Sequence, residues 1–125
     1  WPANVERIEH LAPDGHRAFY NRAAFALNLT RREMVVRGYS PSVRLFEAAA
    51  CGVPIISDVW PGIEELLEPG REILLAHSGE DVLRFMELPE SERAAIGSRG
   101  RSRILAEHTA AHRASQLESY VREVM

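Results

Sequence analysis

Apolar and polar positions divide the chain into short apolar runs that alternate with longer stretches at helical spacing. The short runs predict four strands, over residues 8–11, 25–29, 54–57 and 72–76. Helical spacing predicts helices over residues 16–24, 41–51, 62–67, 79–86, 90–107 and 110–124. Strands that alternate with helices are typical of an α/β fold with a mostly parallel sheet.

Residues 38–58 form the most informative stretch, because they predict a loop, a helix, a tight turn and a buried strand in succession. Ser40 is a favourable N-cap and Pro41 suits the first helical position. Gly52 supplies a left-handed residue that ends the helix. The exposed amides and the positive dipole end at the start of this helix predict an affinity for phosphate.

Glu47 is the acidic residue of this helix, and its helical neighbours Val43 and Cys51 are apolar. An unpaired carboxylate is costly to bury, so Glu47 needs either a partner or solvent. Two interpretations stay open at this point. Glu47 either pairs with Arg44 or lies at a solvated edge, or it is directed at ligand hydroxyls beside the phosphate-binding helix end.

The loops that follow two of the predicted strands flank the same helix. In open parallel sheets, ligands bind outside the carboxyl ends of the strands. Residues 30–40 form a long polar connection, and residues 58–62 follow the next strand. Both loops therefore point to one cleft, in which Asp58 serves either as a ligand contact or as a turn residue.

Composition narrows the classes of function. The chain has 125 residues, which predicts a single domain over 1–125, and its formal net charge of −3 argues against a nucleic-acid surface. All 15 basic side chains are Arg. The lone Cys51 excludes an internal disulfide and fits a reducing compartment. No membrane-spanning run or signal peptide is visible.

Several chemical motifs are absent from the sequence, namely a Walker loop, a GxGxxG loop, an HExxH pair and a CxxC pair. His108 and His112 are four residues apart, but no third ligand accompanies them. The sequence therefore predicts no metal site and no cofactor.

Residues 38–58 resemble the donor-site signature of group-1 glycosyltransferases of the GT-B fold, with the spore-maturation CgeB-like branch the most similar. Residues 19–29, 61–74 and 94–109 are similar to the family's flanking segments. The resemblance implies a bacterial, cytoplasmic protein. It also implies a Rossmann-like parallel sheet of about four strands flanked by helices, a partial GT-B C-terminal domain that ends in long helices.

The resemblance also implies roles for individual residues. Glu47 would accept hydrogen bonds from the ribose hydroxyls of a nucleotide-sugar donor, and the backbone N–H groups of Ser42 and Val43 would bind its diphosphate. Ser40 and Arg44 would add donors. Further possible donor contacts are Tyr39, Thr30 and Asp58. Many members carry a second Glu at the place of Tyr39, and the resemblance assigns no catalytic residue here.

The chain begins at Trp1, and the resemblance implies that an acceptor-binding N-terminal domain and two strands precede it in a longer enzyme. The whole enzyme would move a sugar from a nucleotide diphosphate to a hydroxyl group, and this chain alone would be inactive. A sheet edge left open would favour dimerisation. The alternatives are a nucleotide-sugar epimerase of the same architecture and a non-catalytic binding or assembly module.

Overall fold

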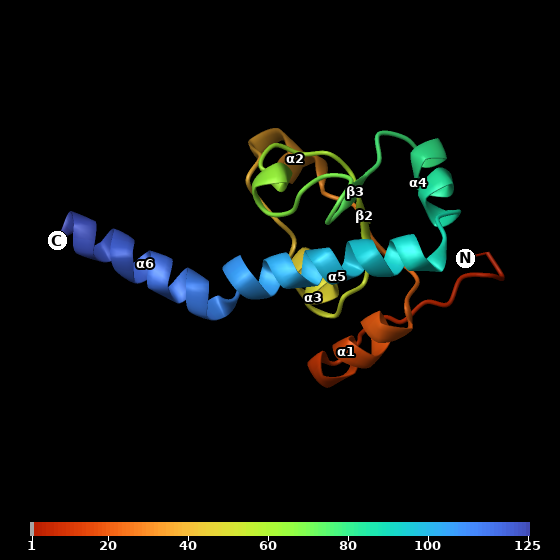
Figure 1. Ribbon diagram of the computed structural model, residues 1–125, viewed down its shortest axis with the longest axis horizontal. Helices are drawn as coiled ribbons and strands as arrows, with labels where there is room; N and C mark the ends of the chain where they lie inside the picture. Colours follow the sequence, from red (N-terminus) through yellow and green to blue (C-terminus); the bar gives the residue numbers. More distant parts are fainter. Residues whose placement is uncertain (1) are drawn as a thin grey trace.

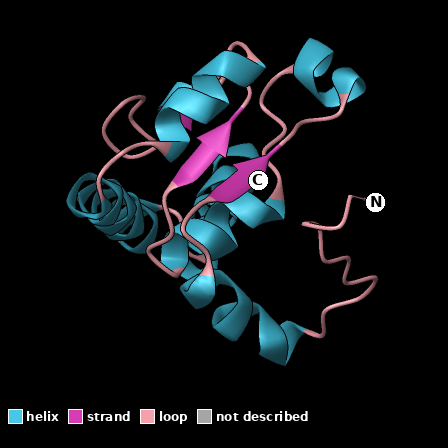
Figure 2. Cartoon of the chain, turned by 90° about the vertical axis from the view of Figure 1, so that its right-hand side faces the viewer, coloured by secondary structure: helices cyan, strands magenta, loops and turns pink. Residues whose placement is uncertain are grey.

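The computed structural model describes residues 2–125 and shows three layers, in which helices lie on both faces of a small sheet (Figures 1 and 2). Its elements, in chain order, are α1 (Pro13–Arg22), β1 (Ala26–Asn28), α2 (Arg32–Arg37), α3 (Val43–Ala50), β2 (Ile55–Ser57), the 3-10 helix η1 (Ile63–Glu65), β3 (Leu74–Leu75), α4 (Gly79–Met86), α5 (Glu90–Glu107) and α6 (Ala110–Val124). The α/β class is confirmed.

The sheet is parallel, with the strand order β1-β2-β3. Ile55 packs with α1, α3 and the second half of α5, whereas its neighbour Ile56 packs with α4 and the first half of α5. Successive residues of a strand point to opposite faces, so β2 is buried on both sides. The chain runs through α3 and then directly into β2, which places the start of α3 at the carboxyl edge of the sheet.

Two glycines let α5 lie directly against the backbone of the sheet layer. A Cβ atom at Gly97 would lie 2.0 Å from the carbonyl oxygen of Gly52, and one at Gly100 would lie 2.9 Å from that of Glu72. Gly52 itself has φ 76°, the left-handed conformation expected for the residue that ends α3. The close approach of α5 therefore depends on the absence of two side chains.

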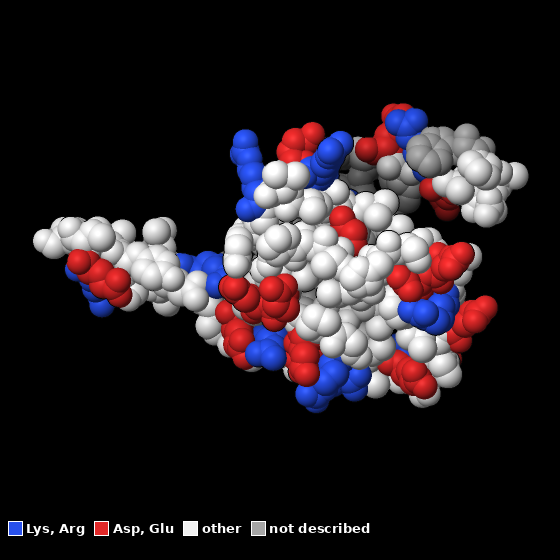
Figure 3. All heavy atoms as spheres, turned by 90° about the horizontal axis from the view of Figure 1, so that it is seen from above, with Lys and Arg blue, Asp and Glu red and all other residues white. Residues whose placement is uncertain are grey.

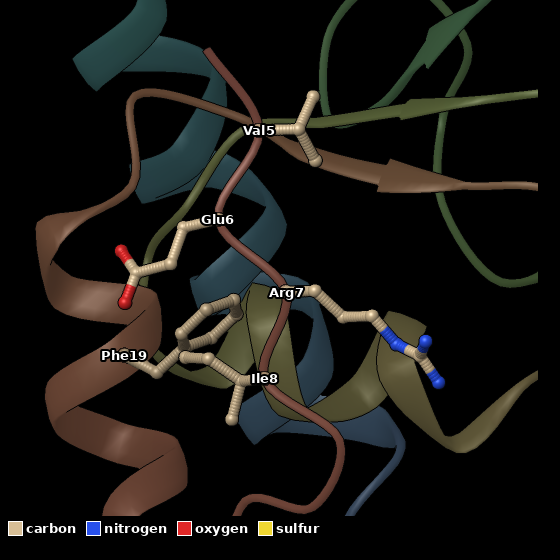
Figure 4. Close-up of a pocket in the computed structure, with 5 residues that line it drawn as sticks. All are labelled: Val5, Glu6, Arg7, Ile8 and Phe19. Atoms are coloured by element: carbon tan, nitrogen blue, oxygen red, sulfur yellow. The ribbon is translucent and has the colours of Figure 1, made fainter. Parts of the chain in front are cut away.

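The strand predicted over residues 8–11 is wrong, because this segment is irregular and the sheet of the described residues has three strands rather than about four. Ile8 is 49% exposed and lines a shallow hollow with Phe19 of α1 (Figure 4). A strand needs a neighbour for its backbone N–H and C=O groups, and β1 does not pair with this segment.

Other boundaries also differ from the predictions, and the helix predicted over residues 16–24 is α1, which begins earlier, at Pro13, and ends at Arg22. The helix expected to begin at Pro41 with Ser40 as its cap begins at Val43, and Ser42 is its N-cap. The polar connection over residues 30–39 contains α2. The helix expected over residues 62–67 is only the short η1, preceded by Gly62 at φ 96°. By contrast, α4, α5 and α6 have the predicted bounds.

Helix α6 extends away from the rest of the molecule (Figure 1), and acidic and basic side chains are interspersed over the face shown in Figure 3. A side-chain cap at Thr109 begins α6, and the apolar residues Leu117, Tyr120, Val121 and Val124 are exposed along it. Among residues 2–125, no helix has both the length and the apolar character needed to cross a membrane.

Candidate functional site

The first turn of α3 leaves a backbone donor open at the carboxyl edge of the sheet. The Ser42 hydroxyl accepts a hydrogen bond from the Arg44 N–H at 3.3 Å, and the Leu45 N–H donates to the Ser42 carbonyl at 3.1 Å. Within the described part of the chain, the Val43 N–H has no acceptor. The Val43 amide thus remains available to an anion, whereas the Ser42 side chain is used for capping.

Glu47 lies one turn further along α3 and faces α1. Its carboxylate Oε1 is 3.3 Å from Nδ1 of His16, and its side chain is 38% exposed. Glu47 is therefore neither enclosed in the core nor directed away from the rest of the protein. The contact with His16 uses Oε1 and not the second carboxylate oxygen, Oε2.

The Glu47 carboxylate also affects its neighbour in α1. Burial raises the pKa of the Tyr20 phenol, the negative charge of Glu47 raises this pKa further, and the positive charge of Arg44 opposes the shift. Tyr20 therefore stays neutral and retains its proton beside the carboxylate.

Arg44 does not form the local pair with Glu47 that one interpretation of the sequence proposed. Its guanidinium Nη1 instead donates to the carbonyl of Leu27 at 3.5 Å, over the open edge of β1. Arg44 is exposed and lines a small hollow together with Tyr20 and Phe25. In this conformation the guanidinium lies at one carbonyl of the strand edge rather than at the start of α3.

Thr30 and Asp58 join the carboxyl ends of β1 and β2. Asp58 accepts hydrogen bonds from the Thr30 N–H at 3.0 Å and from the Thr30 hydroxyl at 2.8 Å. Beneath them, the buried Asn28 amide donates to the Ser57 hydroxyl at 3.0 Å. Both carboxylate oxygens of Asp58 accept hydrogen bonds from Thr30, so this pair forms a structural clamp between the two loops.

Tyr39 is held in a left-handed backbone conformation with φ 50°, which is unusual for a residue with a side chain. Its N–H donates to the Pro61 carbonyl at 2.8 Å, and its ring lies so close to Gly62 that a Cβ there would be 2.5 Å from a ring carbon. The Tyr39 side chain is 68% exposed. The β2–η1 loop therefore fixes an exposed aromatic ring beside the start of α3.

A hollow of about 250 Å³ lies next to this ring. It is lined by residues that include Tyr39, Pro41, Phe46, Trp60, Leu66 and Arg113. Trp60 is 2% exposed, and among the residues that the structure describes its indole Nε1 has no hydrogen-bond partner.

The structure places the sequence-predicted residues in two groups. Ser42, Val43 and Glu47 lie on the first two turns of α3, with Tyr39 and Ser40 in the loop before it, and Thr30 and Asp58 join the strand ends. Ser40 makes no side-chain hydrogen bond within residues 2–125. Residues 2–125 contain no cluster of three or more His, Cys, Asp or Glu that could hold a metal ion.

The sequence analysis missed His16, Asn28, Ser57 and Trp60. His16 and Glu47 are 31 positions apart, so no local spacing could have paired them. A polar Asn within an apolar run, at position 28, was the one signal available for the buried network.

The glycosyl transferase-like family model matches residues 1–119. The chain belongs to this family. No curated protein matches it. Among solved structures, it is similar to a sucrose-phosphate synthase from Thermosynechococcus elongatus, with a TM-score of 0.66, 20% identity and coverage of 85% of this chain.

At this level of identity the likeness shows the fold, and it supports the GT-B arrangement that the sequence predicted. The chain spans 26% of the length of the synthase. The glycosyltransferase resemblance is thus confirmed at the level of the family and of the fold.

Proposed function

We propose that this chain is the donor-binding part of a glycosyltransferase and that it binds a nucleotide-diphosphate sugar at the start of α3. The family match over residues 1–119 carries this proposal. The geometry of α3 supports it, because an open amide and a half-exposed carboxylate lie one turn apart at the carboxyl edge of a parallel sheet.

Each part of the site suits one part of such a donor. The Val43 N–H and the positive end of the α3 dipole attract the diphosphate. The Glu47 carboxylate, which can only accept hydrogen bonds, suits the two hydroxyls of a ribose. In the transfer step, negative charge develops on the departing nucleoside diphosphate, and fixed backbone donors stabilise it. The sugar acceptor is a hydroxyl compound.

Calorimetry with UDP and GDP tests this function directly. Glu47→Ala should weaken nucleotide binding about tenfold or more, because a hydrogen bond to a charged group contributes roughly 1.5–3 kcal/mol. Glu64→Ala is the matched control, since Glu64 is an exposed carboxylate on η1. Nucleotide binding that is unchanged in Glu47→Ala would contradict the proposal and favour a non-catalytic module.

The proposal extends to the partners of this chain. A preceding domain of the same protein would supply the acceptor site, and this chain alone would not transfer sugar. The open edge of β1, where Leu27 is exposed, also offers a surface for pairing with a second copy. Product analysis with UDP- and GDP-sugars tests whether this chain alone transfers sugar. Sedimentation across a concentration series tests whether two copies pair. Turnover by this chain would refute the claim of inactivity.

A further inference from the structure

The contact between His16 and Glu47 joins two helices at the candidate donor site. Nδ1 of His16 lies 3.3 Å from Oε1 of Glu47, and Nε2 lies 3.1 Å from the carbonyl oxygen of Leu11. The ring is further packed edge-on against Tyr20, with 6.4 Å between the ring centroids. His16 is therefore fixed from three sides, by the segment before α1, by α1 itself and by α3.

Both ring nitrogens of His16 face oxygen acceptors. A neutral imidazole donates from one nitrogen only, whereas the protonated ring donates from both. His16 therefore bridges the Leu11 carbonyl and the Glu47 carboxylate, and its tautomer decides which of the two ring nitrogens donates. The groups that act electrostatically on the neighbouring Tyr20 of α1 are Glu47 and Arg44 of α3 and Cys51 at its end.

Glu47 gains a fixed orientation from this bridge. A glutamate side chain has three rotatable bonds, and a half-exposed one samples several rotamers at an entropic cost when it is ordered. With Oε1 held by His16 and the Tyr20 hydroxyl close to the same carboxylate, the carboxylate plane is restrained, and its half-exposed side leaves room for a further donor. Restraint of this kind before the ligand arrives raises affinity, because the ordering cost is already met.

We infer that His16 is a positioning residue that orients Glu47 toward the ribose diol of the donor. This inference rests on the proposed function, since it requires a nucleotide at the start of α3. His16 itself would not touch the nucleotide. Its effect would appear as a preference for ribose over a sugar that lacks a hydroxyl group.

The experiment compares a nucleoside diphosphate with its 2′-deoxy analogue on the same protein sample. In the unmodified chain we expect the ribonucleotide, UDP or GDP, to bind about tenfold more tightly than dUDP or dGDP, since the 2′-hydroxyl donates to a charged group. Glu47→Ala should reduce this ratio to about one. The ratio cancels any inactive fraction of a poorly folded variant, because both ligands are measured on one preparation.

Two substitutions at position 16 separate orientation from packing. His16→Phe keeps a flat ring beside Tyr20 but removes both donors, and we expect the ribose preference to fall to about twofold. His16→Gln retains a side-chain donor and should preserve at least half of the preference. His10→Phe is the matched control, because His10 is exposed in the segment before α1 and makes no side-chain hydrogen bond within residues 2–125.

The outcomes distinguish the two proposals. If the unmodified chain binds neither UDP nor GDP, the proposed function fails and the role of His16 fails with it. If ribose preference depends on Glu47 but is the same in His16→Phe as in the unmodified chain, the proposed function stands and the His16 inference is overturned. Equal losses of ribo- and deoxynucleotide binding in His16→Phe would show a structural role only, which also overturns it.

Discussion

The unit formed by α3, β2 and α5 and the segment of residues 2–12 differ in how they are held. In the α3–β2–α5 unit, the backbone of α5 at Gly97 lies against the backbone at Gly52, between α3 and β2. Side chains of this unit such as Ile55 and Leu45 are almost fully buried. Residues 2–12 form neither a helix nor a strand, and Val5 and Ile8 are exposed. The comparison shows which part of the chain is fixed by its own packing.

The candidate donor site lies between these two regions. Val43 and Glu47 are carried by the tightly packed helix α3, whereas His16 belongs to α1 and is also held by Leu11 from the loose segment. The start of α3 is therefore fixed by the core, and the orientation of the Glu47 carboxylate depends on the more weakly held residues 2–12. The predictions below test this difference in packing.

Gly97→Ala is expected to have a large effect on stability. A methyl group there would lie 2.0 Å from the Gly52 carbonyl oxygen, and backbone atoms would have to move. We expect the free energy of unfolding to fall by about 3 kcal/mol, the upper end of overpacking costs. Gly79→Ala is the control, because a Cβ there meets nothing within 4 Å. Urea denaturation followed by circular dichroism measures both, and equal stabilities would show that α5 is not closely packed.

Thr30→Val should have a smaller effect, on the clamp between β1 and β2. The substitution removes the hydroxyl that donates to Asp58 at 2.8 Å and leaves a partly buried carboxylate oxygen without that donor. The expected loss is about 1–2 kcal/mol in the free energy of unfolding. Thr30→Ser retains the hydroxyl and should restore most of the stability. If the two variants are equally stable, the hydrogen bond contributes nothing.

The sequence predicted elements that begin at a local signal better than elements fixed by distant contacts, for a physical reason. The bounds of α4, α5 and α6 were correct because local signals begin them, such as the Ser78 and Thr109 caps and the break at Pro89. The strand after Gly52 was also correct, since a short β-branched run after a helix-ending glycine has few alternatives.

The errors arose where a structure depends on contacts that local spacing does not reveal. Helix α2 was missed because a polar stretch with three arginines carries no apolar periodicity. Glycine ordinarily weakens the middle of a helix, whereas the structure shows that Gly97 and Gly100 allow α5 to pack closely on Gly52 and Glu72. The partner of Glu47 proved to be the distant His16 rather than the adjacent Arg44.

His108, beside the start of α6, predicts a pH dependence of stability. Burial lowers the pKa of His108, and the positive charge of Arg113 lowers it further. The unfolded chain therefore binds a proton at the ordinary histidine value, about 6.5, before the folded chain does. This contribution to stability is complete above that pH and is lost as the pH falls below it.

His108→Gln should consequently flatten the decline in stability between pH 6.5 and more acidic conditions. The measurement is the urea midpoint at a series of pH values, with the exposed His10→Gln as the matched control. A slope that is the same in His108→Gln and in the unmodified chain would show that His108 has the same pKa in both states.

Ile8→Ala is expected to have the smallest effect, because this side chain is 49% exposed and its segment pairs with no strand. A substitution at such a position changes the free energy of unfolding by less than about 0.5 kcal/mol. The same change at Ile73, which is fully buried between the layers, should cost about 2–5 kcal/mol. A large loss for Ile8→Ala would mean that residues 2–12 stabilise the fold as strongly as the core does. The division between a self-sufficient unit and a weakly held segment, on which the interpretation of the His16–Glu47 contact depends, would then be wrong.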